Sequence, residues 1–290
     1  MHVIWHTPTS FAVFELVVVS LFLVTCWHAT QRPRSQRVEL LMAVLYALLF
    51  EELDIRLFKT YHYGDGYALM LGQVPLVIAL AWAVIISTSM HISDCWPLSA
   101  PARACCDALL ALLIDLSIDA IAIRRGYWQW TIPLNAGWFG VPADNLSAWM
   151  FVVVFFSLLC RLLRRLSAQH KAMLGLAVLV PPLAYLGLLL SLVALGTVNV
   201  LLQLDDNTKL YSTLAVAVGM LVVCLRGHGR SKARSRTTLA PIIVGIRLCL
   251  HGFFVLELLA SGRFLTVPLL LVVALSALLL ELTVHLVTYL

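Results

Sequence analysis

The feature that most constrains this chain is a series of apolar stretches, each of about 20 residues, separated by short polar turns. Hydrophobic residues make up 61% of the 290 residues and charged residues only 12%, whereas a soluble domain is about 25% charged. So few charges cannot cover the surface of a soluble core, so the solvent around the chain must be lipid. The stretches also lack the strict polar–apolar alternation of a lipid-facing β-barrel. The sequence therefore predicts an all-α fold, a polytopic transmembrane helical bundle.

We expect nine helices, with eight as the alternative. Their approximate ranges are 9–27, 38–58, 67–90, 103–123, 146–166, 173–203, 210–225, 239–260 and 266–289. Pro75 predicts a kink inside the third helix. Pro181 and Pro182 predict that the sixth is either one kinked helix or a short piece followed by a span. The first apolar stretch is long and has no basic flank before it, which favours a retained helix over a cleaved signal peptide.

The loops predict the orientation of the bundle. Of the 20 Lys and Arg residues, 13 lie in the loops after the first, third, fifth and seventh helices, and 6 in the intervening loops. By the positive-inside rule this asymmetry puts the N-terminus outside, in a multi-pass protein of the cell inner membrane. The net charge of +5 is spread over these loops and forms no single basic face, so we expect no nucleic-acid partner. The oligomeric state stays open.

No internal repeat or soluble domain is present. We expect residues 1–225 to form a transmembrane helical catalytic core. Residues 226–290 are expected to add a basic loop, RGHGRSKARSR, and two C-terminal transmembrane helices.

Acidic residues at membrane depth are the first indication of a functional site. The stretch LLFEELDIRLF carries Glu51, Glu52 and Asp54, and the stretch DLSIDAIAIRR carries Asp115 and Asp119 one turn apart on one helix face. Both helices run in the same direction, so these acids share one layer. A carboxylate at the bilayer centre costs about 3 kcal/mol or more, and burial favours its neutral form. We therefore predict that Glu51, Asp54, Asp115 and Asp119 are neutral, catalytic proton donors.

A structural explanation competes with this prediction. Glu52 and Arg56 have the i, i+4 spacing of an ion pair. Asp119 can in the same way reach Arg124 or Arg125 at the end of its helix. Several acids in one layer nevertheless favour a functional site, since ionisable residues within a membrane are costly.

An aromatic loop follows the second pair of acids. Trp and Tyr also form belts at membrane interfaces, but here the rings crowd beside carboxyl groups, and aromatic faces stabilise cations. The candidate substrate-binding residues are Trp128, Trp130, Trp138, Asn145, Trp82 and Tyr127.

Neutral acids and aromatic faces together suit carbocation chemistry. An acid protonates an isolated alkene, the rings stabilise the tertiary carbocation, and water or an internal double bond captures it. This chemistry requires no cofactor, and the sequence has no nucleotide-binding motif. The seven cysteines form no C-x-x-C pair with histidine partners, so no metal site is predicted. The alternatives are a terpenoid or carotenoid cyclase, a proton-coupled membrane transporter, and a catalytically silent subunit of a pigment complex.

Three stretches carry a family resemblance: YHYGDGYALMLGQVPLVIALAWAVIISTSM, DLSIDAIAIRRGYWQW and GWFGVPADNLSAW. They resemble the integral-membrane carotenoid biosynthesis proteins, whose best-known members are carotenoid 1,2-hydratases of the bisanhydrobacterioruberin hydratase type. The likeness covers about residues 50–149. The matching positions are Asp119, Trp128, Trp130, Gly137, Phe139, Gly140, Val141, Pro142, Asn145 and Trp149. The chain departs at Ala120, where members often have Pro, and at Ala148, where they often have Gly.

The resemblance implies a hydro-lyase that hydrates the terminal C1=C2 bond of an acyclic carotenoid or similar polyprenoid. Its partners would be this lipophilic substrate, water and membrane lipid. Asp115 or Asp119 would donate the proton, and Glu51 or Asp54 would orient water or share the proton. Asn145 would hold water or anchor the loop. The rings expected to line the cation are Trp128, Trp130 and Trp138.

Overall fold

The computed structural model describes residues 2–3, 8–228 and 238–289. Within these residues the chain forms nine α-helices, as the sequence predicts. They are α1 (Thr9–Thr30), α2 (Arg34–Phe58), α3 (Leu76–Asp94), α4 (Ala100–Arg125), α5 (Ala143–Gln169), α6 (Val180–Leu201), α7 (Lys209–Gly227), α8 (Pro241–Ala260) and α9 (Pro268–Tyr289). The strands are β1 (His2–Val3), β2 (Tyr61–Tyr63), β3 (Leu69–Leu71), β4 (Val74–Pro75) and β5 (Trp128–Trp130), and the 3-10 helices are η1 (Lys171–Leu179) and η2 (Arg263–Leu265).

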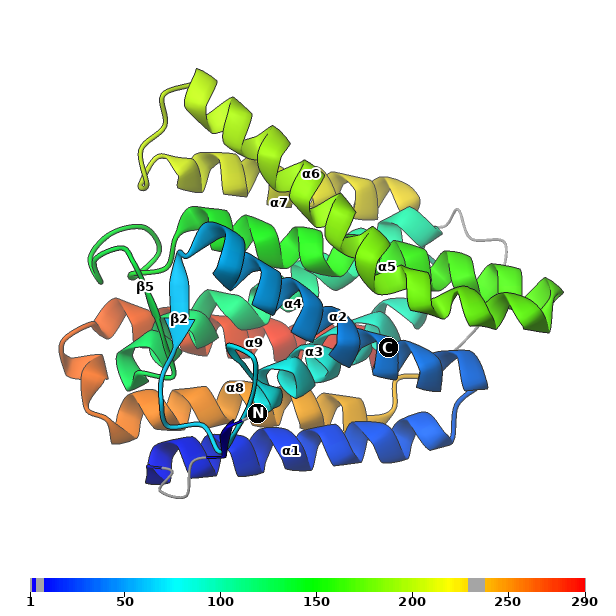
Figure 1. Ribbon diagram of the computed structural model, residues 1–290, viewed down its shortest axis with the longest axis horizontal. Helices are drawn as coiled ribbons and strands as arrows, with labels where there is room; N and C mark the ends of the chain where they lie inside the picture. The colour runs from blue at the N-terminus through cyan, green and yellow to red at the C-terminus, as the bar shows by residue number, and fades with distance from the viewer. Residues whose placement is uncertain (1, 4–7, 229–237, 290) are drawn as a thin grey trace.

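The helices form one bundle, with α6 and α7 along one edge and α1 and α8 along the opposite edge (Figure 1). Seven helical segments are long and apolar enough to cross a membrane. The remaining two long helices, α2 and α4, carry more charged residues but have 25 and 26 residues. At about 1.5 Å per residue, both exceed the hydrocarbon thickness of a bilayer. The protein is an all-α membrane bundle, and its predicted orientation stays a prediction.

Helix α4 is the centre of the bundle. It packs against α3, α5, α7, α8 and α9, and nearly every side chain from Leu110 to Ile123 is buried. Acidic residues within a membrane are costly beside lipid, so a helix that carries them lies in the interior of a bundle. Pro101 lies in its first turn, where a missing N–H costs no hydrogen bond. Gly126 ends it with a φ of +73°, a conformation that glycine adopts without strain.

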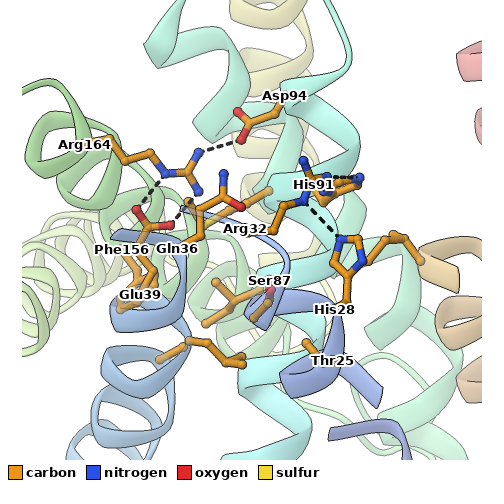
Figure 2. A pocket seen from close by; sticks show the side chains of 16 residues that line it. Thr25, His28, Arg32, Gln36, Glu39, Ser87, His91, Asp94, Phe156 and Arg164 are labelled. Carbon is orange, nitrogen blue, oxygen red and sulfur yellow. Dashed lines mark hydrogen bonds and ion pairs between the residues drawn. The ribbon is translucent and has the colours of Figure 1, made fainter. Parts of the chain in front are cut away.

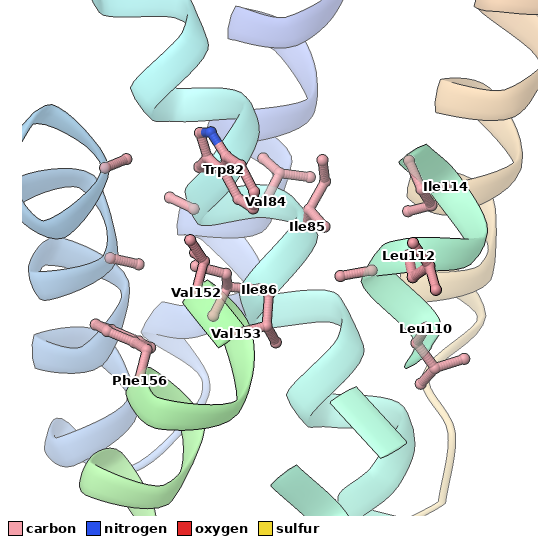
Figure 3. Close-up of a cluster of buried hydrophobic side chains, with 14 of the residues drawn as sticks. Trp82, Val84, Ile85, Ile86, Leu110, Leu112, Ile114, Val152, Val153 and Phe156 are labelled. Carbon is pink, nitrogen blue, oxygen red and sulfur yellow. The ribbon is translucent and has the colours of Figure 1, made fainter. Parts of the chain in front are cut away.

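A buried apolar core lies between the middle helices. Branched aliphatic and aromatic side chains of α3, α4 and α5 fill this region, as Figure 3 shows. Ile86, Ile114 and Val153 are each exposed by no more than 1%. These contacts fix how deep α4 lies in the bundle, and therefore where its carboxyl groups lie.

The predicted start of the third helix at residue 67 is wrong, and so is the kink at Pro75. Strands β3 and β4 pair antiparallel, and Gly72 turns the chain between them with a φ of +66°. Pro75 stands immediately before α3 as its N-cap residue. Since proline lacks the N–H that a helix interior needs, it begins this helix and does not bend it.

For the sixth helix the second alternative is correct. Residues 171–179 form η1, and α6 begins at Val180 with Pro181 and Pro182 in its first turn. The predicted basic loop falls largely on residues 229–237, which lie outside the described residues.

A two-stranded ribbon closes one end of the bundle. Strand β2, after α2, pairs antiparallel with β5, after α4. Tyr61 is opposite Trp130, and Tyr63 is opposite Trp128. Successive residues of a strand point to opposite faces, so all four rings share one face and are partly buried, whereas the central residue of each strand, His62 or Gln129, is exposed. The ribbon thus turns its aromatic face toward the helices.

Candidate active site

Two carboxyl groups lie beneath the aromatic face of this ribbon. Glu51 on α2 is 5% exposed and Asp119 on α4 is 2% exposed. They come from separate helices, but the ribbon joins the ends of those helices and supplies hydrogen-bond donors to both. The sequence predicted that acids of the second and fourth helices lie in one layer, and Glu51 and Asp119 lie in this way.

Glu51 accepts three hydrogen bonds. The Tyr61 hydroxyl and the Tyr63 hydroxyl both donate to Oε2, the latter at 2.6 Å, and Trp82 Nε1 donates to Oε1 at 2.7 Å. Burial raises the pKa of Tyr61 and of Tyr63 well above the usual range. Both phenols therefore keep their protons and act as donors.

Asp119 has a similar set of donors. The indole of Trp128 donates to Oδ1, as does Trp130 Nε1 at 3.2 Å. Asn145 Nδ2, in the first turn of α5, donates to Oδ2 at 2.5 Å. Among the described residues no cation lies within 4 Å of Glu51 or Asp119. Each carboxyl group is therefore held by neutral N–H and O–H groups alone.

The possible pairing of Asp119 with an arginine at the end of its helix does not occur. Arg124 Nη1 donates to the backbone oxygens of Ala120 and Phe139, at 2.8 and 2.7 Å. Arg125 Nε donates to Glu257 on α8 at 2.5 Å. Arg124 therefore holds the loop against the end of α4, and Arg125 holds the end of α4 against α8.

A cavity of about 590 Å³ opens beside the two carboxyl groups. This volume is within the range of roughly 300–1,000 Å³ that small-molecule sites have. Its lining is mainly apolar and comes from eight helices, α1 to α8, together with the ribbon. Apolar lining residues include Phe14, Val18, Phe50, Ile78, Ile85, Trp149, Val152, Leu192, Val193, Leu250 and Phe254. A long hydrocarbon fits such a surface, since it has no polar group to desolvate.

Seven of the predicted site residues line this cavity: Glu51, Asp54, Trp82, Asp119, Trp128, Trp130 and Asn145. Asp54 is bonded to the Tyr185 hydroxyl of α6 at 3.0 Å. Trp82 lies over Trp149 with ring centroids 4.0 Å apart. These residues come from α2, α3, α4, α5 and β5, so only the folded bundle brings them together.

The other three predicted residues do not line the cavity. Asp115 is fully buried, and neither of its carboxyl oxygens has a hydrogen-bond partner. Trp138 Nε1 donates to the backbone oxygen of Leu116 at 2.8 Å, which anchors the aromatic loop on α4. Tyr127 stacks on Phe14 at 4.9 Å, and its hydroxyl donates to the Ser10 oxygen at 3.1 Å.

Sequence reasoning missed Tyr61, Tyr63 and Tyr185. The spacing of the first two was an available signal, because Y-x-Y repeats the two-residue period of W-x-W at Trp128 and Trp130. Two such stretches predict strands whose rings share a face. Tyr185 had no such signal in an otherwise apolar helix.

The described residues contain no group of three or more His, Cys, Asp and Glu side chains placed to hold a metal ion. A family model described as carotenoid biosynthesis protein matches residues 9–224. No curated protein and no solved structure matches the chain. The matched range includes every residue named above for the carboxyl pair and its donors, and ends before α8.

Proposed function

Because the chain belongs to the carotenoid biosynthesis protein family, we propose that it hydrates a terminal isoprenoid C=C bond of an acyclic carotenoid or polyprenoid. One observation carries this proposal. Two buried carboxyl groups, each held by neutral donors, face a largely apolar cavity of about 590 Å³. Burial without a neighbouring cation favours the protonated form, which is the form that an alkene requires of its acid, and the donors stabilise the carboxylate that remains after proton transfer.

Asp119 is the proton donor in this mechanism. Its Oδ2 has one hydrogen-bond partner, Asn145 Nδ2, so it can also carry the acidic proton. The proton adds to the CH carbon of a terminal (CH₃)₂C=CH group. The π electrons of the double bond form the new C–H bond, and the adjacent carbon becomes a tertiary carbocation.

The indoles of Trp128 and Trp130 stabilise this carbocation. Both rings line the cavity, and both donate their N–H to Asp119, which fixes the rings beside the acid. The negative face of an aromatic ring attracts a cation more strongly where water is excluded. Trp82 and Trp149 form a second aromatic wall of the cavity.

Glu51 orients the water that captures the carbocation. Its Oε1 accepts only the Trp82 N–H, so a lone pair is available for a water O–H. The water oxygen forms the new C–O bond, and its surplus proton returns to the Asp119 carboxylate, which regenerates the acid. Asp54, one turn beyond Glu51, can share this proton. The net reaction adds one water molecule to the double bond.

Water capture is favoured over ring closure by the polar edge of the cavity. Asp144, Asn199 and Lys209 also line it, and the side chains of Asp144 and Lys209 are 48% and 25% exposed. A polar, partly exposed edge beside the acids gives water a route to the carbocation. A cyclase, by contrast, must exclude water until the ring closes. We place the bundle in the cell inner membrane, with residues 1–225 as its catalytic core and α8 lining one wall.

The experiment is co-expression of the chain with enzymes that make lycopene, followed by mass analysis of the lipid extract. Hydration yields a product heavier than lycopene by one water, whereas cyclisation yields a product of unchanged mass. Asp119→Asn is the test variant. Asp65→Asn, which changes an exposed loop aspartate outside the cavity, is the control. An unchanged lycopene pool with the wild-type chain would contradict hydration of this substrate class.

A further inference from the structure

A second, smaller cavity lies at the opposite end of the bundle. It has a volume of about 40 Å³ and is formed where α1 and α3 end and α2 begins, with α5 beside them. It shares no lining residue with the larger cavity. Figure 2 shows its polar side chains in two groups on opposite sides, one around Arg164 and one around Arg32.

The Arg164 group is electrically paired. Arg164 donates to both carboxylate oxygens of Glu39, at 2.6 and 2.5 Å, and to Asp94 Oδ2 at 2.6 Å. Asp94 Oδ1 also accepts a bond from Arg161 at 3.1 Å. Two-pronged contacts of this kind are strong and geometrically specific. The two carboxylates that line the cavity, Glu39 and Asp94, are therefore already paired with arginines.

The Arg32 group is different, because among the described residues no carboxylate lies within 4 Å of its guanidinium. Arg32 Nη2 is bonded to His91 Nδ1 at 2.8 Å, and Arg32 Nε donates to His28 Nε2 at 3.4 Å. An imidazole nitrogen that accepts from a guanidinium belongs to a neutral ring. Neither partner therefore cancels the arginine charge, and the two N–H groups of Arg32 Nη1 have no partner among the described residues.

We propose that this cavity binds one phosphate group. A single water occupies roughly 10–15 Å³ of such a cavity, so 40 Å³ holds about three oxygen-sized groups, the number of unesterified oxygens on a phosphate monoester. Arg32 supplies the uncompensated charge and the free N–H donors, and the Gln36 amide adds a neutral donor. Arginine suits phosphate because its planar fork matches two oxygens.

The position of the cavity agrees with a phosphate that arrives at the membrane surface. His28, Arg32 and Gln36 are only partly buried, so a ligand can reach them from outside. Arg165, an exposed arginine at the same end, adds attraction for anions. By the positive-inside rule this end is cytoplasmic, where anionic lipid gives the leaflet a negative potential. The phosphate belongs either to a lipid headgroup or to a free ion, and the experiment separates the two.

The test uses the full chain, purified in an uncharged detergent. Short-chain phosphatidic acid, inorganic phosphate and short-chain phosphatidylcholine are each titrated while Tm is recorded. Phosphatidic acid is expected to raise Tm saturably, since a ligand that binds only the folded state stabilises it. Phosphatidylcholine, whose headgroup has no net charge, is the ligand control. If phosphate alone also raises Tm, the source is a free ion, and if only the lipid does, it is a headgroup.

Arg32→Gln is expected to weaken binding at least about tenfold, the cost of a lost charge-assisted contact. Arg34→Gln, a change of an exposed arginine two residues away, is the matched control and should keep wild-type affinity. Arg32→Lys retains the charge but not the fork, so it should bind less tightly than wild type and more tightly than Arg32→Gln. The proposal is overturned if none of the ligands raises Tm, or if Arg32→Gln binds as tightly as Arg34→Gln. Neither outcome depends on the proposed hydration.

Discussion

Tyr63 and Trp128 are paired across the two-stranded ribbon, yet they donate hydrogen bonds to carboxyl groups on different helices. Tyr63 donates to Glu51 of α2 at 2.6 Å, and Trp128 donates to Asp119 of α4. The ribbon continues at both ends through backbone bonds, from Thr131 N to Thr60 O at 2.9 Å and from Gly64 N to Tyr127 O at 3.0 Å. A single rigid element therefore fixes both acids relative to one cavity, and the first predictions follow from it.

Asp119→Asn is expected to lower hydration by about a hundredfold or more, because it removes the general acid. Asp115→Asn should leave activity within a few-fold of wild type, since Asp115 lies outside the cavity. The measurement is conversion of an acyclic carotenoid by membranes that contain equal amounts of each variant. Full activity of Asp119→Asn, or loss of activity in Asp115→Asn alone, would contradict the assignment of the proton donor.

Tyr63→Phe removes one donor from Glu51 while keeping the ring. A buried acceptor that loses a partner costs about 1–3 kcal/mol, so we expect a lower Tm and slower hydration. Tyr211→Phe is the matched control, because the Tyr211 side chain is 72% exposed on α7. Thermal unfolding in detergent and product formation are the two measurements. Equal Tm values for the two variants would show that the Tyr63 hydrogen bond is not stabilising.

Arg124→Gln is expected to loosen the aromatic loop between β5 and α5. Arg124 holds this loop through the backbone oxygens of Phe139 at 2.7 Å and Leu134 at 3.4 Å. Loss of the guanidinium group should speed the exchange of the backbone amide hydrogens of residues 131–142, while the exchange in α4 stays slow. Arg56→Gln, which changes an exposed arginine on α2, provides the comparison. Unchanged exchange in the loop would mean that Trp138 and the turn alone hold it.

Gly196→Phe is expected to reduce the space available to the substrate. Gly196 lines the large cavity on α6, and a side chain there would meet no atom within 4 Å at its first carbon. The ring therefore fills the cavity without breaking the helix packing, and the KM for a long polyprenoid should rise. Gly219→Phe places the same ring at an open position of α7 outside the cavity and should leave KM unchanged. Equal KM values for the two variants would argue against substrate binding at α6.

Glu281→Ala is expected to destabilise the bundle by about 3–5 kcal/mol, because it leaves a buried arginine unpaired. Arg247 on α8 contacts both carboxylate oxygens of Glu281 on α9, and both residues are fully buried. A double variant, Arg247→Met with Glu281→Leu, should lose less stability than Glu281→Ala. Arg56→Ala removes the exposed partner of Glu52 and should cost no more than about 1 kcal/mol. The free energy of unfolding in detergent tests both, and a double variant as unstable as Glu281→Ala would contradict the argument.

Local patterns in the sequence were sufficient for some of the site. The i, i+4 spacing predicted the Glu52–Arg56 ion pair, which the structure confirms. Glu51, Asp54 and Asp119 stood out because a carboxyl group inside an apolar helix is costly wherever it lies. The same reasoning could not separate Asp119 from Asp115. The two residues are one turn apart on α4, and only their surroundings in the bundle differ.

The sequence by itself determined the membrane class and the nine helices, because hydropathy and length act locally and do not depend on which helices touch. It determined also that acids and indoles lie near one end of the bundle, since alternating helices return to the same side. Only the tertiary structure decided that Asp119 faces the cavity and Asp115 does not. It also decided that Tyr61, Tyr63 and Tyr185 complete the set of hydrogen-bond donors. The rotation of each helix about its own axis is set by packing among residues distant in sequence, and local patterns do not encode it.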